Sequence, residues 1–198
     1  MALVDRVKSI LLSPAREWQV IDGETTTPGA LYAGYVVPLA AIGPIAQVIG
    51  YSVFGFRVPF TGAVWKAPIG SALSGALVSY VLTLIAVYVL ALVIDGLAPT
   101  FDGTKSQIQA LKVAAYSSTA SWLAGIFALL PGLRVLGILG LYSLYLLYLG
   151  LPVLMKSPKE RALGYTVVVI IAAVVLFMII GLVAARFTAM PMGGMMTH

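Results

Sequence analysis

The stretch that decides the fold is residues 133–161, LRVLGILGLYSLYLLYLGLPVLMKSPKER. From 135 to 155 it contains no charged side chain, and about 20 apolar residues are enough for a helix to cross the hydrocarbon core of a bilayer. A basic turn with Lys156, Lys159 and Arg161 follows directly. The stretch therefore predicts a membrane-spanning helix that ends at a charged loop in water.

The composition of the whole chain agrees with this prediction. Of its 198 residues, 61% are hydrophobic and 10% are charged, whereas soluble domains carry about 25% charged residues. The mean hydropathy is +1.03. Cysteine is absent and the single histidine is the terminal His198, which excludes disulfides and thiolate metal sites and argues against histidine-ligated metals. We therefore predict an all-α, polytopic integral membrane protein that needs no metal or other cofactor.

Several segments without a charged side chain are long enough to cross a bilayer: residues 28–54, 68–94, 113–133, 135–155 and 162–185. The third and fourth are joined by a short turn at Pro131-Gly132, so we expect an antiparallel hairpin. Pro38 and Pro44 interrupt the first segment and favour a kink over a broken helix that lines a binding site. The sequence thus predicts a bundle of five transmembrane helices within residues 25–186, followed by a flexible tail at 187–198.

Residues 1–24 predict an amphipathic N-terminal segment. Residues 2–12 place apolar side chains on one helical face and charged ones on the other, and Ser13-Pro14 marks the start of a second short helix that carries Trp18. These helices either pack on the rest of the protein or lie in the headgroup region with Trp18 as an interface anchor, and we favour the interfacial arrangement. Charged residues interrupt the first 21 residues, so no cleavable signal peptide is expected.

The distribution of basic residues predicts the orientation. The N-terminal segment and the connections after the second and fourth predicted spans carry eight lysines and arginines, and the opposite side carries four. The positive-inside rule therefore predicts a cytoplasmic N-terminus and a C-terminus outside. All seven acidic residues also fall on the cytoplasmic side, so that face is the better candidate for binding a partner.

Hydroxyl groups gather on the third and fourth predicted spans, and we call this set the serine–tyrosine layer. Its members are Tyr116, Ser117, Ser121, Tyr142, Tyr145 and Tyr148. Tyrosine hydroxyls at membrane depth need hydrogen-bond partners, and we expect the serines of the neighbouring span to supply them. The layer is either a tightly packed contact between helices or the lining of a polar cavity.

Charged residues border this layer on the predicted cytoplasmic side: Asp95, Asp102 and Lys112. Asp95 lies where the second span should end, and a carboxylate is unfavourable at a helix C-terminus. We therefore expect Asp95 to pair with Lys105 or Lys112. Two carboxylates supply too few oxygens for a hard cation, so ion pairing is favoured over a metal site. Pro152 should bend the fourth span near its cytoplasmic end.

Four motifs carry a resemblance to a known family: SPAREW at 13–18, FDGTK at 101–105, KVAAYSS at 112–118 and LYSLYLLYLGLPVLMK at 141–156. With them, the chain resembles the bacterial branch of the Yip (Ypt-interacting protein) family. The resemblance implies a five-span protein of the bacterial inner membrane with a cytoplasmic N-terminus, and it implies homo- or hetero-oligomers. Eukaryotic members are associated with Rab-type GTPases, vesicle traffic and membrane shaping. Family members often carry a proline where this chain has Ala120, so a straighter third helix is expected here.

An enzyme is not predicted, because HExxH, GxSxG, CxxC and GxxxxGK[ST] are all absent. We predict a membrane scaffold or adaptor that contacts membrane lipids, forms a homo-oligomer and uses its charged face to bind a cytoplasmic protein, with no nucleic-acid partner. Small residues at 70, 71, 74 and 75 fit either a dimer interface or packing within one chain. The alternative is a small transporter or channel for a lipid, an ion or a neutral solute that uses the serine–tyrosine layer.

Overall fold

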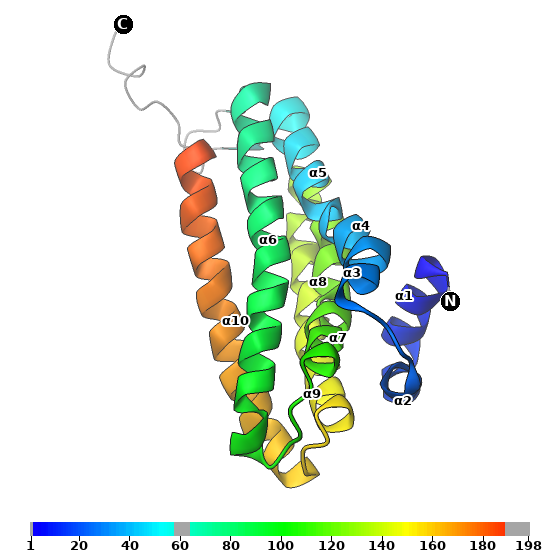
Figure 1. Cartoon of the computed structure of the whole chain (residues 1–198). Coiled ribbons are helices and arrows are strands. Elements are labelled where there is room, and N and C mark those ends of the chain that lie inside the picture. Colours follow the sequence, from blue (N-terminus) through cyan, green and yellow to red (C-terminus); the bar gives the residue numbers. More distant parts are fainter. Residues whose placement is uncertain (1, 58–63, 189–198) are drawn as a thin grey trace, which may run out of the picture.

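The computed structural model describes residues 2–57 and 64–188, and its long helices run side by side (Figure 1). The two longest are α6 (Ile69–Leu97) and α10 (Lys159–Thr188). At 1.5 Å per residue, α6 is about 44 Å long, whereas the hydrocarbon core of a bilayer is about 30 Å thick. One or both ends of this helix therefore extend beyond the lipid tails.

The first predicted span is helical from Pro28 to Phe54 but not uniformly α-helical. Its successive segments are α3 (Pro28–Leu31), the π-helical turn η1 (Tyr32–Val36), α4 (Val37–Ala40), α5 (Ile42–Ile49) and a second π-helical turn, η2 (Gly50–Phe54). Pro38 and Pro44 lack backbone N–H groups, so the regular hydrogen-bond ladder cannot continue through them. The π-helical turn η1 directly precedes the α4 segment that contains Pro38, and a turn at Ala41 precedes Pro44, so the helix is irregular where each proline interrupts it.

The third predicted span is broken at Ser118. It consists of α7 (Gln107–Ser117), α8 (Thr119–Ala124) and the short 3₁₀ helix η4 (Gly125–Leu129). Around the break, Ser118 Oγ donates to the carbonyl of Ala114 at 2.8 Å, and Thr119 Oγ1 donates to that of Tyr116 at 2.6 Å. Side-chain bonds of this kind compete with the helical ladder and bend helices. The third span is therefore irregular at Ser118, and the expectation of a straighter helix than in relatives with a proline at 120 stays a prediction.

The returning arm of the hairpin starts as a 3₁₀ helix, η5 (Pro131–Leu141), and continues as α9 (Tyr142–Leu154). Runs of 3₁₀ helix longer than three or four residues are uncommon, and this one has 11. Glycines at 132, 137 and 140 lower its α-helical propensity. Pro152 lies inside α9 near its C-terminal end, and the bend expected there stays a prediction.

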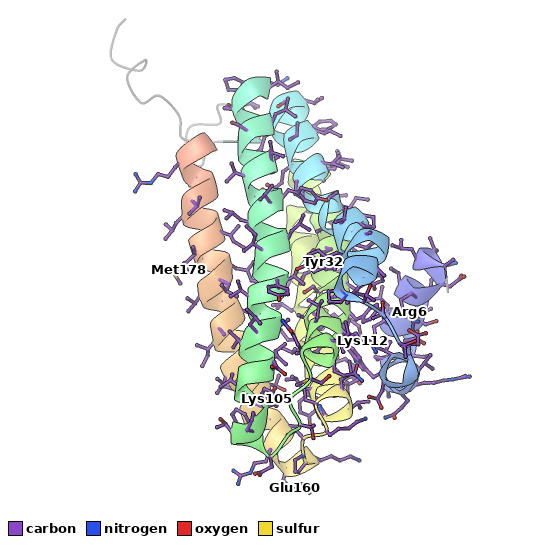
Figure 2. All side chains as sticks on the ribbon, viewed as in Figure 1. Arg6, Tyr32, Lys105, Lys112, Glu160 and Met178 are labelled. Atoms are coloured by element: carbon purple, nitrogen blue, oxygen red, sulfur yellow. The ribbon has the colours of Figure 1, made fainter. Side chains whose placement is uncertain are left out.

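Within the described residues, the helices long and apolar enough to cross a membrane are Pro28–Phe54, Ile69–Phe101, Val135–Leu154 and Lys159–Val183. They match four of the five predicted spans. The third, at 113–133, is too irregular to count as one long helix, so the fifth crossing and the orientation of the termini stay predictions. Large apolar side chains such as Leu77 and Ile85 are exposed, as lipid contact requires, and Met178 points away from the bundle (Figure 2).

The short connections complete the fold. Before α6, the two-residue strands β1 (Phe56–Arg57) and β2 (Val64–Trp65) pair antiparallel. After α6 comes the 3₁₀ turn η3 (Ala98–Phe101). Residues 58–63, between strands β1 and β2, lie outside the described residues. Helix α10 runs two residues into the predicted tail, and the rest of that tail, 189–198, also lies outside them.

Buried side chains concentrate toward one end of the bundle, which we call the charged end. It is formed by η3 and by the connections at 102–106 and 155–158, and Lys105 and Glu160 lie there (Figure 2). Ile94 of α6, Leu151 of α9 and Tyr165 of α10 are fully buried near this end. The N-terminal helices α1 (Leu3–Leu12) and α2 (Pro14–Gly23) lie against the same half of the bundle (Figure 1).

Candidate functional site

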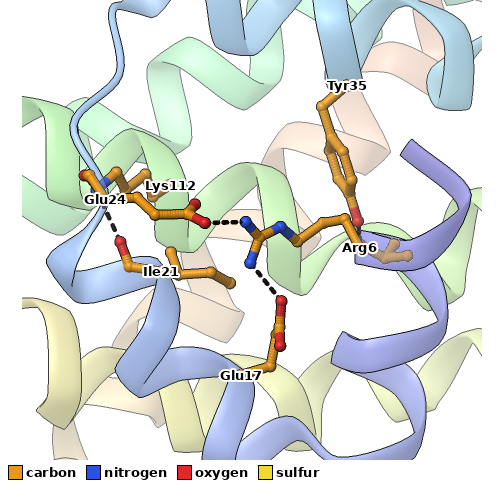
Figure 3. Close-up of polar contacts among 7 residues, drawn as sticks. Arg6, Glu17, Ile21, Glu24, Tyr35 and Lys112 are labelled. Atoms are coloured by element: carbon orange, nitrogen blue, oxygen red, sulfur yellow. Dashed lines mark hydrogen bonds and ion pairs between the residues drawn. The ribbon is translucent and has the colours of Figure 1, made fainter. Parts of the chain in front are cut away.

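A buried ion cluster joins the N-terminal helices to the bundle. The guanidinium of Arg6 donates to the carboxylates of both Glu17 and Glu24 (Figure 3). Arg6 and Glu17 are each 5% exposed, and the Arg6 guanidinium also lies 5.6 Å from the centroid of the Tyr116 ring. Burial alone would lower the pKa of Arg6, but the hydrogen bond and the charge of Glu24 raise it, so the side chain stays cationic.

Lys112 completes the cluster from α7. It is 2% exposed, and its Nζ donates to the carbonyl of Ile21 at 2.9 Å and to that of Glu24 at 2.5 Å. Carbonyls at the end of a helix lack intrahelical partners, so this lysine caps the C-terminus of α2. Burial lowers the pKa of Lys112. Lys112 is thus committed to α2, and the expected pairing with Asp95 is not formed.

Trp18 is the apolar centre of this junction. It is fully buried, and its ring meets Tyr116 edge to face at 6.3 Å. A Cβ atom added to Gly150 of α9 would lie only 2.7 Å from Trp18 Cζ2, so the indole rests directly on the α9 backbone. The interpretation of Trp18 as an interface anchor was therefore wrong. The SPAREW motif and the glycine of the LYSLYLLYLGLPVLMK motif, which are far apart in the sequence, therefore form one contact.

A second layer of aromatic contacts connects the junction to the first span. The rings of Tyr35 and Tyr116 are 4.6 Å apart, and Tyr35 shares a 2.7 Å hydrogen bond with Thr119 Oγ1. Sequence reasoning selected Tyr116 and Lys112 but missed Arg6, Glu17 and Glu24. The signal that could have found them is the surplus of charge within residues 5–24 of a chain that is otherwise so apolar.

The serine–tyrosine layer is divided between two environments. Ser121 Oγ lies 2.8 Å from Ser143 Oγ of α9 and donates to the carbonyl of Gly140 at 3.1 Å, whereas Ser117 only bonds back to Ala114 of its own helix. Tyr142 donates to the carbonyl of Leu11 at 3.0 Å. The expected bonds between the tyrosines and the serine cluster are therefore not formed.

The spacing of residues on α9 explains this outcome. Tyr142, Tyr145 and Tyr148 are all substantially exposed on the outer face, and the Tyr142 and Tyr145 rings are 5.4 Å apart. Ser143 and Gly150, seven residues apart and hence on one face, lie on the inner side. Small residues let α9 approach α8 and α2 closely, which leaves no room there for tyrosine rings.

The charged residues expected to border the serine–tyrosine layer do not form one site: Lys112 belongs to the ion cluster, whereas Asp95 and Asp102 lie near the charged end. Asp102 forms an ion pair with Arg161 at 3.1 Å, and both side chains are about 60% exposed. Asp95 has a buried oxygen, Oδ1, without a hydrogen-bond partner in the described residues. Asp22, which was not selected, pairs with Lys156 at 2.5 Å and accepts from Gln109 at 3.1 Å.

The FDGTK and LMKSP segments meet at this end. The backbone N–H of Thr104 donates to the carbonyl of Met155 at 2.7 Å, and Ser157 Oγ donates to that of Phe101 at 2.7 Å. A Cβ on Gly103 would lie 2.8 Å from the Met155 oxygen. Glycine is therefore required at 103 because the two connections approach so closely.

Comparisons with known proteins agree with the motifs. The family model described as the Yip1 domain matches residues 8–181. The chain is 28% identical over 167 residues to inner membrane protein YohC of Escherichia coli strain K12, covering 82% of this chain and 85% of that protein. The YohC protein of Escherichia coli O6:H1 matches with the same values. No solved structure matches the chain.

Proposed function

The chain belongs to the Yip1 domain family of multi-pass membrane proteins, and from this premise we propose that it is a non-enzymatic scaffold or adaptor of the bacterial inner membrane. In this role it would present a fixed surface at the membrane boundary and assemble laterally with further copies. The proposal has two parts, a partner-binding surface on α1–α2 and an oligomer contact on α6.

The observation that carries the proposal is the rigid attachment of α1–α2 to the bundle. We infer that the ion pairs of Arg6 with Glu17 and Glu24 hold α1–α2 in one arrangement, because displacing either helix would leave a buried charge unpaired. The outer face of the two helices exposes Leu12 at 80% and Val20 at 43%, and Lys8 and Arg16 lie beside them. Apolar and basic side chains held in a fixed arrangement suit contact with a membrane surface or a protein partner.

The proposed oligomer contact is the outer face at the start of α6. Gly70, Leu73, Ser74 and Leu77 are exposed there, and a Cβ on Gly70 would meet nothing within 4 Å. Gly70 and Ser74 are one turn apart and form a small-xxx-small pair, which allows close approach of a second helix in lipid. This face supports assembly with another copy better than packing within the chain, because no described helix covers Gly70.

Cysteine cross-linking in native membranes tests the proposal, because the chain has no cysteine of its own. Ser74→Cys should form disulfide-linked dimers on mild oxidation. The matched control is Ile171→Cys on α10, which is also exposed but lies outside the proposed face, and it should stay monomeric. A photo-cross-linker at Arg16 should capture a defined protein partner or lipid. Monomers at position 74 together with no product from position 16 would contradict the scaffold role.

The alternative, a small transporter or channel, is favoured by one specific observation. A pocket of about 510 Å³ lies between α8, η5 and α10 and is lined by small and apolar residues that include Ser121, Gly137, Gly140 and Ala173. Its lining suits an acyl chain or a neutral solute better than an ion. Flux across liposomes that is lost on Ala173→Phe would support transport, and the absence of flux across a panel of lipids and solutes would oppose it.

A further inference from the structure

A second pocket, of about 550 Å³, lies between α1 and the start of the first span. Its lining is polar and includes Arg6, Glu24, Thr25, Thr26 and Tyr116, and Leu3, Ala30 and Gly34 contribute apolar surface. Gly23–Thr26 precede the first apolar segment, and Ala30, Gly34 and Tyr35 lie inside it. The pocket therefore lies at the boundary between the lipid tails and water, at the depth of phospholipid headgroups.

The charges around the pocket disfavour an anionic ligand. Both terminal nitrogens of Arg6 are engaged, one by Glu17 and the other by Glu24. Lys112 is directed to backbone carbonyls and is almost fully buried, so it cannot reach a ligand either. The charge of Arg6 is therefore already compensated by two carboxylates, so a phosphate or a carboxylate in the pocket would gain little further electrostatic attraction there.

The groups that are still available are acceptors and hydroxyls. Glu24 bonds Arg6 through Oε1, its side chain is 39% exposed, and it lines the pocket, so its second oxygen is available as an acceptor. The hydroxyls of Tyr116 and Thr25 make no hydrogen bond with any described residue. The second oxygen of Glu24 and the hydroxyl of Tyr116 can both accept hydrogen bonds from an organic ammonium group, and the carboxylate adds attraction between opposite charges.

We propose that this pocket binds the headgroup of an aminophospholipid, with the primary ammonium at Glu24 and Tyr116 and the phosphate ester at the hydroxyls of Thr25 and Thr26. The acyl chains would leave along the exposed side of Ala30, Gly34 and Val37. The site does not depend on the scaffold role. It gives the N-terminal helices a ligand that is present at one defined depth of the membrane.

Native mass spectrometry of the detergent-released protein tests the site. The protein is titrated with phosphatidylethanolamine and with phosphatidylglycerol of the same acyl chains, and we expect about tenfold stronger retention of the amine, the value of one charge-assisted hydrogen bond. Gly34→Leu should abolish the preference by filling the pocket, because a Cβ there meets nothing within 4 Å. Gly29→Leu is the matched control, since that glycine is equally open but does not line the pocket.

Glu24→Gln tests the charge separately from the shape. It keeps an acceptor for Arg6 but removes the negative charge, so the retention ratio of the two lipids should fall to about one. A third experiment adds soluble phosphoethanolamine, because it carries the same ammonium and phosphate groups as the lipid headgroup. Competition by it without any lipid retention would assign the pocket to a soluble ligand and overturn the lipid proposal. Equal retention of both lipids by the wild type, or full retention by Gly34→Leu, would overturn it as well.

Discussion

Replacing Gly150 with alanine tests the contact between α2 and α9 most directly. The new Cβ would lie 2.7, 2.8 and 2.9 Å from three carbons of the Trp18 indole. The indole cannot move away easily, because Trp18 is fully buried and packs edge to face on Tyr116. We expect α2 to be displaced from α9, with the loss of several contacts at the junction.

The size of the effect follows from two opposing contributions. Inserting a methyl group into a closely packed core costs about 1–3 kcal/mol. Replacing glycine with alanine inside a helix contributes up to about 1 kcal/mol in the other direction. Gly150→Ala should therefore lower the free energy of unfolding by about 1–2 kcal/mol relative to the wild type.

The assay is reversible unfolding in micelles, followed by circular dichroism. Gly181→Ala on α10 is the matched control, because a Cβ there meets nothing within 4 Å, and it should be neutral or stabilising. Trp18→Leu in the Gly150→Ala background removes the clash, so the double variant should be more stable than the sum of the single changes predicts. Equal stability of the Gly150→Ala and Gly181→Ala variants would refute a close contact between Gly150 and Trp18.

Charged residues of the junction and of the charged end give further predictions. Arg6→Met leaves Glu17 buried and unpaired, so it should lower the free energy of unfolding by about 3–5 kcal/mol and expose α1–α2 to protease. Adding Glu17→Leu to Arg6→Met should recover most of this loss. Equal protease sensitivity of the single and the double variant would contradict this expectation. Folding lowers the pKa of Lys112. Just below the ordinary lysine pKa of about 10.4, the unfolded chain therefore binds more protons than the folded chain. The contribution of Lys112 to stability should therefore rise as the pH increases toward that value. This contribution is measured by comparing the pH dependence of unfolding in the wild type and in Lys112→Met. Parallel curves of unfolding free energy against pH would rule it out. Asp102→Asn breaks an exposed ion pair with Arg161 and should change the free energy of unfolding by less than about 1 kcal/mol. If this variant is as stable as the wild type but fails in a cross-linking or binding assay, the lost interaction is a contact with a partner.

The periodicity on α9 illustrates where sequence reasoning succeeded and where it failed. Tyr142, Tyr145 and Tyr148 repeat every three residues, and this spacing places them on one side of a helix. Their positions are exposed, and the inner face belongs to Ser143 and Gly150. Hydroxyl groups stand out in an apolar sequence, but the residues that let helices approach are small, and their pattern is less conspicuous. The contact between α9 and its neighbouring helices was therefore assigned to the tyrosines, whereas Ser143 and Gly150 form it.

The sequence by itself determined the class of protein and the course of its long helices. Membrane insertion depends on the summed hydrophobicity of about 20 consecutive residues, which is a local property, so four of the predicted spans coincide with long apolar helices. The family was recognisable for the same reason, since its motifs are short and contiguous.

Only the tertiary structure decided which motifs meet. Arg6 lies next to Glu24 and Tyr116, and Trp18 lies against Gly150, although more than 90 residues separate Arg6 from Tyr116 and Trp18 from Gly150. A charged residue in an amphipathic helix has the same pattern whether it faces water or pairs with a buried partner. The difference arises from how the helices pack, because the cost of burying a charge is offset only where the fold places its counter-charge.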